Sequence, residues 1–160
     1  MRLLLVCIGR SKAGPERDLA ARYIGRAAAA GRAIGFPGLE LREAAESRAA
    51  RPDDRKREEA KALRGLIPPG FTMIALDETG KPLTSTGFAA ELGRARDAAT
   101  AGAALVIGGP DGLDSALLGE ASLTLSFGAL TWPHQLVRIM AAEQIYRAMT
   151  ILSGHPYHRE

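Results

Sequence analysis

The last eight residues, SGHPYHRE, gather side chains that can move a proton or bind an anion. Two of the three histidines of the chain, His155 and His158, lie there beside Tyr157 and Arg159. Histidine ordinarily exchanges its proton near neutral pH, and the arginine guanidinium matches the geometry of phosphate. Because chain termini usually fray and carry little chemistry, this composition predicts a functional C-terminal segment.

Two glycine-containing segments are candidates for binding a small ligand. They are IGGPDG, at 107–112, and FGALTWPH, at 127–134, and each follows an apolar run. Glycine has no Cβ, so a ligand can lie directly against its backbone. A single loop of this kind is most often only a tight turn. Two such loops at neighbouring strand ends, however, predict a backbone-lined crevice of the kind that binds ligands in open α/β sheets.

Three other loop chemistries are excluded by the residues present. The loop after the first apolar run offers only Gly9 and Gly14, so the G-x-G-x-x-G pattern of dinucleotide-binding folds is missing. A cysteine phosphatase built on Cys7 would need arginine at position 13, which is Ala13. The Gly80-Lys81 pair lacks the upstream glycine of a Walker loop. A small phosphate-handling hydrolase is therefore not supported.

Composition indicates one globular domain spanning residues 1–160. Apolar residues make up 46% and charged residues 24% of the chain, which is typical of folded soluble proteins. The lone Cys7 cannot form an internal disulfide, and no metal-ligand cluster is present, which favours a reducing compartment. The apolar run at 3–8 is too short for a signal peptide core, and no stretch has transmembrane length. We therefore expect a cytoplasmic protein without a membrane partner.

The charge pattern permits a phosphate-bearing partner without demanding one. The formal net charge is +3, and 17 of the 21 basic residues are arginine. Residues 46–64 alternate positive and negative charges with few apolar side chains. Such a run is usually a solvated helix face. The functional alternative is an arm that contacts nucleic-acid phosphates, and the salt dependence of binding would separate the two.

The hydrophobic pattern predicts the elements that must position these residues. Continuous apolar runs predict strands covered on both faces, and the alternating run LELREA predicts an edge strand. The predicted strands are 3–9, 39–44, 71–77, 103–109 and 122–130, and the predicted helices are 16–30, 53–66, 86–99, 113–118 and 133–152. The alternation of strands and helices predicts an α/β fold with a mostly parallel sheet and helices on both faces.

The last predicted helix begins at Pro133 and ends near Gly154, in agreement with usual helix start and stop signals. Its apolar residues spread over more than one stripe: Leu136, Val137, Ile139, Met140, Ile145, Met149 and Leu152. So wide an apolar arc predicts that the helix is covered on two sides. The sheet can cover one side and a second subunit the other. A central helix in a compact monomer remains the alternative.

Four motifs in order resemble a known family. IALDETGKPLTS, IGGPDGL, SFGALTWPHQLVRIMAAEQIYRA and the terminal HPYHRE resemble the pseudouridine N3-methyltransferases of large-subunit (23S) ribosomal RNA, within the SPOUT class of methyltransferases. The resemblance is sharpest from Ile74 to the end and weaker between Arg10 and Gly70. It implies an enzyme that uses S-adenosyl-L-methionine, acts on ribosomal particles and works as a homodimer. It also implies a C-terminal trefoil knot, which general topology rules argue against.

The resemblance also implies which residues hold the cofactor. The matching positions are Leu76, Gly108, Phe127, Gly128, Ala129, Leu130, Thr131 and Trp132. Phe127, Gly128 and Trp132 stand where many family members carry Leu, Ser and Leu. Contacts made mainly by the backbone would tolerate these differences.

For the substrate half of the site, the resemblance points to the terminal segment. N3 of pseudouridine must lose its proton before it attacks, and a well-placed base contributes about 100-fold or more. His158 is assigned as this base, Tyr157 as a stacking or hydrogen-bonding partner, and Arg159 as a partner for phosphate or developing negative charge.

Further polar residues are weaker candidates for RNA contact, and each has a structural alternative. His155 can instead shape the turn before Pro156, and Arg147 can instead pair with Glu143 at helical spacing. Arg138 is a candidate RNA contact, and His134 suits a capping or packing role at least as well as catalysis. The competing function is a non-catalytic ribosomal RNA-binding assembly factor, which would need no cofactor.

Overall fold

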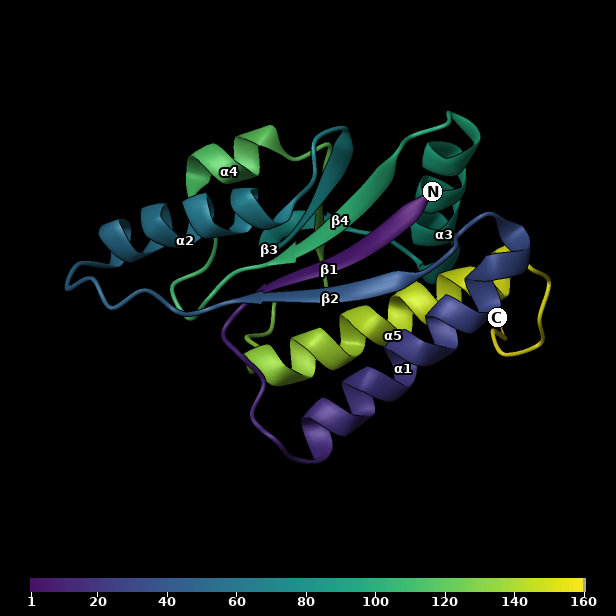
Figure 1. The fold of residues 1–160 in the computed structure, drawn as a ribbon, viewed down its shortest axis with the longest axis horizontal. Coiled ribbons are helices and arrows are strands. Elements are labelled where there is room, and N and C mark those ends of the chain that lie inside the picture. The colour runs from purple at the N-terminus through teal and green to yellow at the C-terminus, as the bar shows by residue number, and fades with distance from the viewer. Residues whose placement is uncertain (160) are drawn as a thin grey trace.

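The computed structural model describes residues 1–159, which form one five-stranded parallel sheet flanked by helices (Figure 1). The strand order is β2-β1-β4-β3-β5. The strands are β1 (Arg2–Ile8), β2 (Leu39–Ala44), β3 (Phe71–Pro82), β4 (Gly102–Ile107) and β5 (Leu123–Ser126). The predicted α/β fold is confirmed, and β2 lies at an edge of the sheet as its alternating pattern predicts.

Helices cover both faces of the sheet. They are α1 (Pro15–Gly31), α2 (Pro52–Leu66), α3 (Ser85–Asp97), α4 (Ser115–Glu120) and α5 (His134–Leu152), with a short 3-10 turn at Arg32–Ile34. In Figure 1, α2 and α4 lie above the sheet, and α1 and α5 lie side by side below it. The residues of α3 join the same core as α1 and α5. All five helices begin and end within two residues of their predicted bounds.

The continuous apolar runs follow from this layering. Along β1, Leu3, Leu5 and Cys7 point into the core shared with α1, α3 and α5. Leu4 and Val6, which alternate with them, point into the second core, shared with α2 and α4. Since successive strand residues face opposite sides, a strand covered on both faces needs apolar residues at every position.

Strand β3 is longer than predicted and irregular at its carboxyl end. Its register with β5 places both Leu76 and Lys81 opposite Leu125, so residues 77–80 form a bulge. A Cβ on Gly80 would lie 2.6 Å from the backbone carbon of Leu125. Glycine is therefore required at this close approach of two backbones, and the bulge places Asp77 and Glu78 just after Leu76, the last residue of β3 that pairs with β4.

The predicted adjacency of the two glycine loops is wrong in one respect. Strand β3 lies between β4 and β5, so the loops that follow β4 and β5 flank the end of β3 rather than meeting directly. The predicted strand 122–130 also ends early, at Ser126, and its last apolar residues belong to the loop. The trefoil knot stays a prediction. Within residues 1–159, no helix is long and apolar enough to cross a membrane.

Candidate active site

A pocket of about 330 Å³ opens where β3, β4 and β5 end. The bulge of β3 and the two glycine-containing loops form its wall. Its lining residues are Leu76, Asp77, Glu78, Ile107, Gly108, Gly109, Pro110, Asp111, Gly112, Leu113, Ser126, Phe127, Gly128, Leu130, Thr131, Trp132, His134 and Val137. Seven of the eight positions predicted for cofactor binding therefore come together, and Ala129 is not among the lining residues. The volume is within the range of small-molecule sites.

The loop at 107–112 is shaped by its own glycines. The backbone nitrogen of Gly112 donates to the carbonyl oxygen of Gly109 at 2.9 Å. A Cβ on Gly108 would lie 2.9 Å from the backbone carbon of Gly112 and 3.1 Å from Leu113 Cδ2. Any side chain at position 108 would push the two arms of the turn apart. Gly108 is therefore needed for the shape of the loop itself, before any ligand is considered.

The pocket combines negative charge with exposed apolar surface. Asp77 and Glu78 line it from β3, and the Asp77 carboxylate also accepts hydrogen bonds from the backbone nitrogen and hydroxyl of Thr79 at 2.9 and 2.6 Å. On the opposite loop, Leu130 is 72% exposed and Trp132 is 37% exposed. A ligand that carries both a positive charge and an apolar or aromatic group matches this lining.

Arg138 is not available to RNA as predicted. It is only 5% exposed, and its guanidinium pairs with Glu43 Oε1 at 2.6 Å and donates to the carbonyl of Gly9 at 2.8 Å. It also contacts the Ser11 hydroxyl. The expected RNA contact is corrected to a structural role, in which Arg138 ties α5 to the loop after β1.

The terminal segment folds back onto α5 of the same chain. The Tyr157 hydroxyl donates to Glu143 Oε1 at 3.1 Å, and its ring packs on Tyr146 with a centroid separation of 4.7 Å. The Arg147 guanidinium lies 4.9 Å from the centre of the Tyr157 ring. It also pairs with Glu143 at 2.6 Å, so the predicted helical ion pair is confirmed.

The hydrogen-bonding roles of Tyr157 and His158 follow from their contacts. Burial and hydrogen bonding raise the pKa of Tyr157 to about 12, so this phenol remains a donor at neutral pH. His158 Nδ1 lies 3.3 Å from Arg147 Nη1. Because arginine only donates, Nδ1 accepts here, and the neutral ring carries its proton on Nε2. The backbone nitrogen of Tyr157 donates to His155 Nδ1 at 3.2 Å, so His155 takes part in the turn around Pro156, and its predicted RNA contact stays a prediction.

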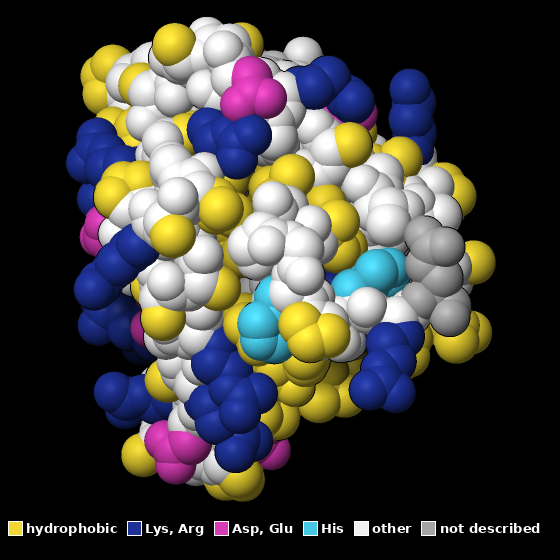
Figure 2. Space-filling model, turned by 90° about the vertical axis from the view of Figure 1, so that its right-hand side faces the viewer, with side chains coloured by type: hydrophobic (Ala, Val, Ile, Leu, Met, Phe, Trp, Pro, Cys, Tyr) yellow, Lys and Arg dark blue, Asp and Glu magenta, His cyan; other side chains and the backbone are white. Residues whose placement is uncertain are grey.

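The pocket and His158 contact different parts of α5. His134 and Val137, in the first turn of the helix, line the pocket, whereas Arg147, which contacts His158, lies ten residues beyond Val137. At 1.5 Å per residue this separation is about 15 Å. Figure 1 shows the start of α5 at one side of the molecule and the C-terminus at the other. Histidine side chains lie exposed among apolar and basic ones on that second side (Figure 2).

Several pocket residues were not identified from the sequence. Asp77 and Glu78 directly follow an apolar run, and that position at a strand end could have identified them as pocket residues. Val137 and His134, the capping candidate, line the pocket from the first turn of α5. No local signal pointed to Arg55, which pairs with Asp111 across 56 residues of sequence.

A parallel α/β sheet with a glycine-lined pocket at its strand ends defines a class of small-ligand-binding enzymes. A family model described as a predicted SPOUT methyltransferase matches residues 1–158. "Ribosomal RNA large subunit methyltransferase H" of Beijerinckia indica is 60% identical over 99% of both chains. The protein of the same description from Methylocella silvestris is 58% identical over the full length of both. The chain therefore belongs to the SPOUT methyltransferase family, as the motif resemblance indicated.

A solved structure agrees with this fold. A probable methyltransferase from Bordetella pertussis Tohama I matches 92% of this chain and 95% of its own length, with a TM-score of 0.51 and 19% identity. SPOUT methyltransferases use S-adenosylmethionine, and the pocket suits this molecule. Asp77 and Glu78 bring negative charge to the pocket of a ligand that carries cationic groups, and the exposed Leu130 and Trp132 bring apolar surface.

Proposed function

We propose that this protein transfers a methyl group from S-adenosylmethionine to N3 of a pseudouridine in large-subunit ribosomal RNA. The observation that carries the proposal is the 60% identity, over 99% of both chains, to a ribosomal RNA large subunit methyltransferase H. The glycine-lined pocket supports the cofactor half, and the motif resemblance supports pseudouridine N3 as the acceptor. An enzyme that acts on ribosomal particles works in the cytoplasm.

In this proposal the pocket binds and orients the methyl donor. When bound, S-adenosylmethionine supplies an electrophilic methyl group on its sulfonium. Leu76 and the loops 107–112 and 127–132 hold the cofactor mainly through backbone groups, so the departures at Phe127, Gly128 and Trp132 are tolerated. Alignment of the donor carbon with the acceptor nitrogen can lower the barrier to a displacement of this kind by about 7–11 kcal/mol.

The two halves of the site require a second copy of the chain. Within one chain, Arg147, which contacts His158, lies about 15 Å along α5 from Val137, and none of residues 155–159 is among the pocket lining residues. Helix α5 runs from the pocket to the terminal segment. A two-fold axis crossing α5 near its middle would bring the terminal segment of each chain to the pocket of the other.

An apolar groove supports this arrangement. It has a volume of about 580 Å³ between α1, α3 and α5, and Tyr23, Phe88, Ile139 and Met140 are among its lining residues. Glu143, which holds Tyr157, lines the same groove, so the groove is continuous with the terminal segment. The neighbouring Leu136 is 42% exposed. We infer that a second copy covers this surface and forms a homodimer.

The terminal segment then performs the proton chemistry. His158 accepts the N3 proton of the substrate, for which it must leave Arg147, since that contact occupies its Nδ1 lone pair. Tyr157 remains protonated and stacks on or donates to the base. Arg159 is exposed and pairs with an RNA phosphate or with developing negative charge.

Methyl incorporation from labelled cofactor into ribosomal particles tests the function. The unmodified protein should label large-subunit RNA. Deletion of residues 155–160 should leave the fold and cofactor affinity nearly intact while methylation falls at least about 100-fold. His158→Ala should slow the chemical step, with partial rescue at higher pH, and Arg159→Ala should also weaken binding to particles.

A substitution in the glycine loop tests the cofactor-binding half of the site. Gly108→Ala should abolish cofactor binding in a protein that still folds, because the added Cβ would lie 2.9 Å from the Gly112 backbone. Full turnover by the truncated protein would show that the base lies elsewhere. Binding to ribosomal particles without methyl incorporation would favour the non-catalytic assembly factor instead.

A further inference from the structure

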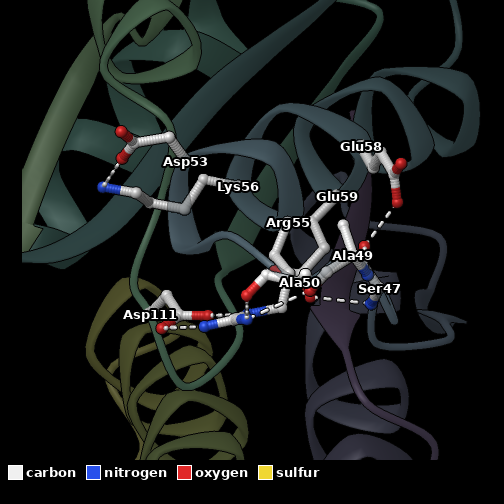
Figure 3. A network of polar contacts seen from close by, with 9 residues as sticks. All are labelled: Ser47, Ala49, Ala50, Asp53, Arg55, Lys56, Glu58, Glu59 and Asp111. Carbon is white, nitrogen blue, oxygen red and sulfur yellow. Dashed lines mark hydrogen bonds and ion pairs between the residues drawn. The ribbon is translucent and has the colours of Figure 1, made fainter.

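The first two turns of α2 are attached to the glycine loop that lines the pocket. Arg55 Nε donates to Asp111 Oδ2 at 2.6 Å, and Nη2 donates to Oδ1 at 3.1 Å, which is a bidentate ion pair. The remaining nitrogen, Nη1, donates to the carbonyl oxygens of Ala49 and Ala50, each at 3.1 Å. One guanidinium therefore joins the pocket loop, the segment before α2 and α2 itself (Figure 3).

One turn further along α2, Glu59 packs against the same loop. Its side chain is buried, at 4% exposure, and Oε1 accepts a hydrogen bond from the backbone nitrogen of Ser47 at 3.0 Å. The other oxygen, Oε2, has no hydrogen-bond partner among the residues that the structure describes. A Cβ on Gly109 would lie 2.7 Å from this oxygen. The Glu59 carboxylate thus fills the space behind the loop that a side chain at position 109 would take.

These contacts hold the loop from residues that are not part of the pocket lining. Within the loop, the bridge between Gly109 and Gly112 supplies the backbone hydrogen bond, and glycines are the residues that lose most freedom on ordering. A loop that is already ordered binds its ligand without that cost. The Arg55 and Asp111 side chains are only about one-quarter exposed, so their bidentate ion pair contributes to global stability as well. Its effect on cofactor binding follows from the position in which it holds Asp111 and its neighbours.

We propose that Arg55 and Glu59 are positioning residues that hold the 108–112 loop in its cofactor-binding conformation. The inference rests on the proposed cofactor role of this pocket. It gives the charged run at 46–64 a function that neither a solvated helix face nor an RNA-binding arm describes. In this role α2 tunes the affinity for S-adenosylmethionine without touching it.

A matched ion pair on the same helix provides the control. Arg64 Nη2 lies 2.6 Å from Glu120 Oε1 and joins α2 to α4, away from the pocket lining. Calorimetric titration with S-adenosylmethionine should show about tenfold weaker binding for Arg55→Ala. Arg64→Ala should stay within about twofold of the unmodified protein. Arg55→Lys should recover little, because lysine cannot make the bidentate pair and the two carbonyl contacts together.

The double variant separates positioning from direct contact. If Asp111 acts only through Arg55, then Arg55→Ala with Asp111→Ala should bind no more weakly than either single variant. In turnover measurements, only the KM for the cofactor should rise, with the KM for ribosomal particles unchanged. Normal cofactor affinity in Arg55→Ala, with only a lower melting temperature, would overturn the proposal. Failure of the unmodified protein to bind the cofactor would instead overturn the proposed pocket, and the positioning role with it.

Discussion

At the scale of single residues, the shape of the site depends on glycines and on pairs of charged side chains that lie far apart in the sequence. Gly108 was identified from its motif, and the structure adds the reason, which is contact within the loop itself. Arg55 and Arg138 could not be placed from the sequence, because their partners Asp111 and Glu43 lie 56 and 95 residues away. Local patterns of charge do not reveal pairs of that separation.

Glu59 gives a prediction for the pH dependence of stability. The pKa of Glu59 is higher in the folded protein than in the unfolded chain, and burial is the largest cause of this shift. Ionisation is therefore costlier in the folded state, and stability is lost as pH rises through the raised pKa. Glu59→Gln, which keeps the acceptor for Ser47, should melt at a higher temperature than the unmodified protein at pH 8.

The difference in melting temperature between Glu59→Gln and the unmodified protein should shrink as pH falls toward 4, where both proteins carry a neutral side chain at position 59. Thermal melting followed by circular dichroism at pH 8 and pH 4 measures this difference. Glu58→Gln, one residue earlier and exposed, is the control for replacing a carboxylate by an amide on this helix. A Glu59→Gln protein that is less stable than the original at pH 8 would contradict the argument.

At the scale of elements, the sequence predicted the helices and strands well and their arrangement less well. Continuous apolar runs gave β1 and β4 closely, because both strands are covered on two faces. The position of β3 between β4 and β5 could not be read from any run, since strand order depends on contacts between distant segments. The broad apolar arc of α5 is explained by its packing against α1 and α3 and by the exposed Leu136.

The packing of α5 against the sheet depends on the buried side chain of Arg138. This side chain is the buried anchor between α5 and the loop after β1, and its partner Glu43 lies on β2. Removal of one member of a buried ion pair typically costs about 3–5 kcal/mol because the other charge is left unpaired. Arg138→Met should therefore lower the free energy of unfolding by about that amount.

Chemical denaturation monitored by tryptophan fluorescence measures this change. Arg138→Met combined with Glu43→Leu removes both charges and should recover part of the lost stability. Arg94→Met, which breaks the exposed pair with Glu91, should cost less than about 1 kcal/mol. An Arg138→Met protein as stable as the Arg94→Met control would show that the buried pair does not anchor α5.

At the scale of the whole molecule, the proposed function requires two chains. The pocket and the terminal segment were both predicted from the sequence, but their separation along α5 was not, because no sequence pattern reports distances between loops. The proposed homodimer, in which each chain completes the site of the other, would explain why the terminal segment and the pocket stand apart. Light scattering at micromolar concentration should accordingly give twice the 16.9 kDa mass of the chain.

Complementation between two inactive variants tests this central claim most directly. One chain carries Gly108→Ala, which disables the pocket, and the other lacks residues 155–160, which disables the terminal segment. In a heterodimer, the intact terminal segment of the first chain meets the intact pocket of the second. After subunit exchange at equal concentrations, half of the dimers are mixed and each has one complete site, so about a quarter of the normal methylation of ribosomal particles should return. If the terminal segment serves the pocket of its own chain, no mixed dimer holds a complete site, and the absence of any recovered activity would contradict the account.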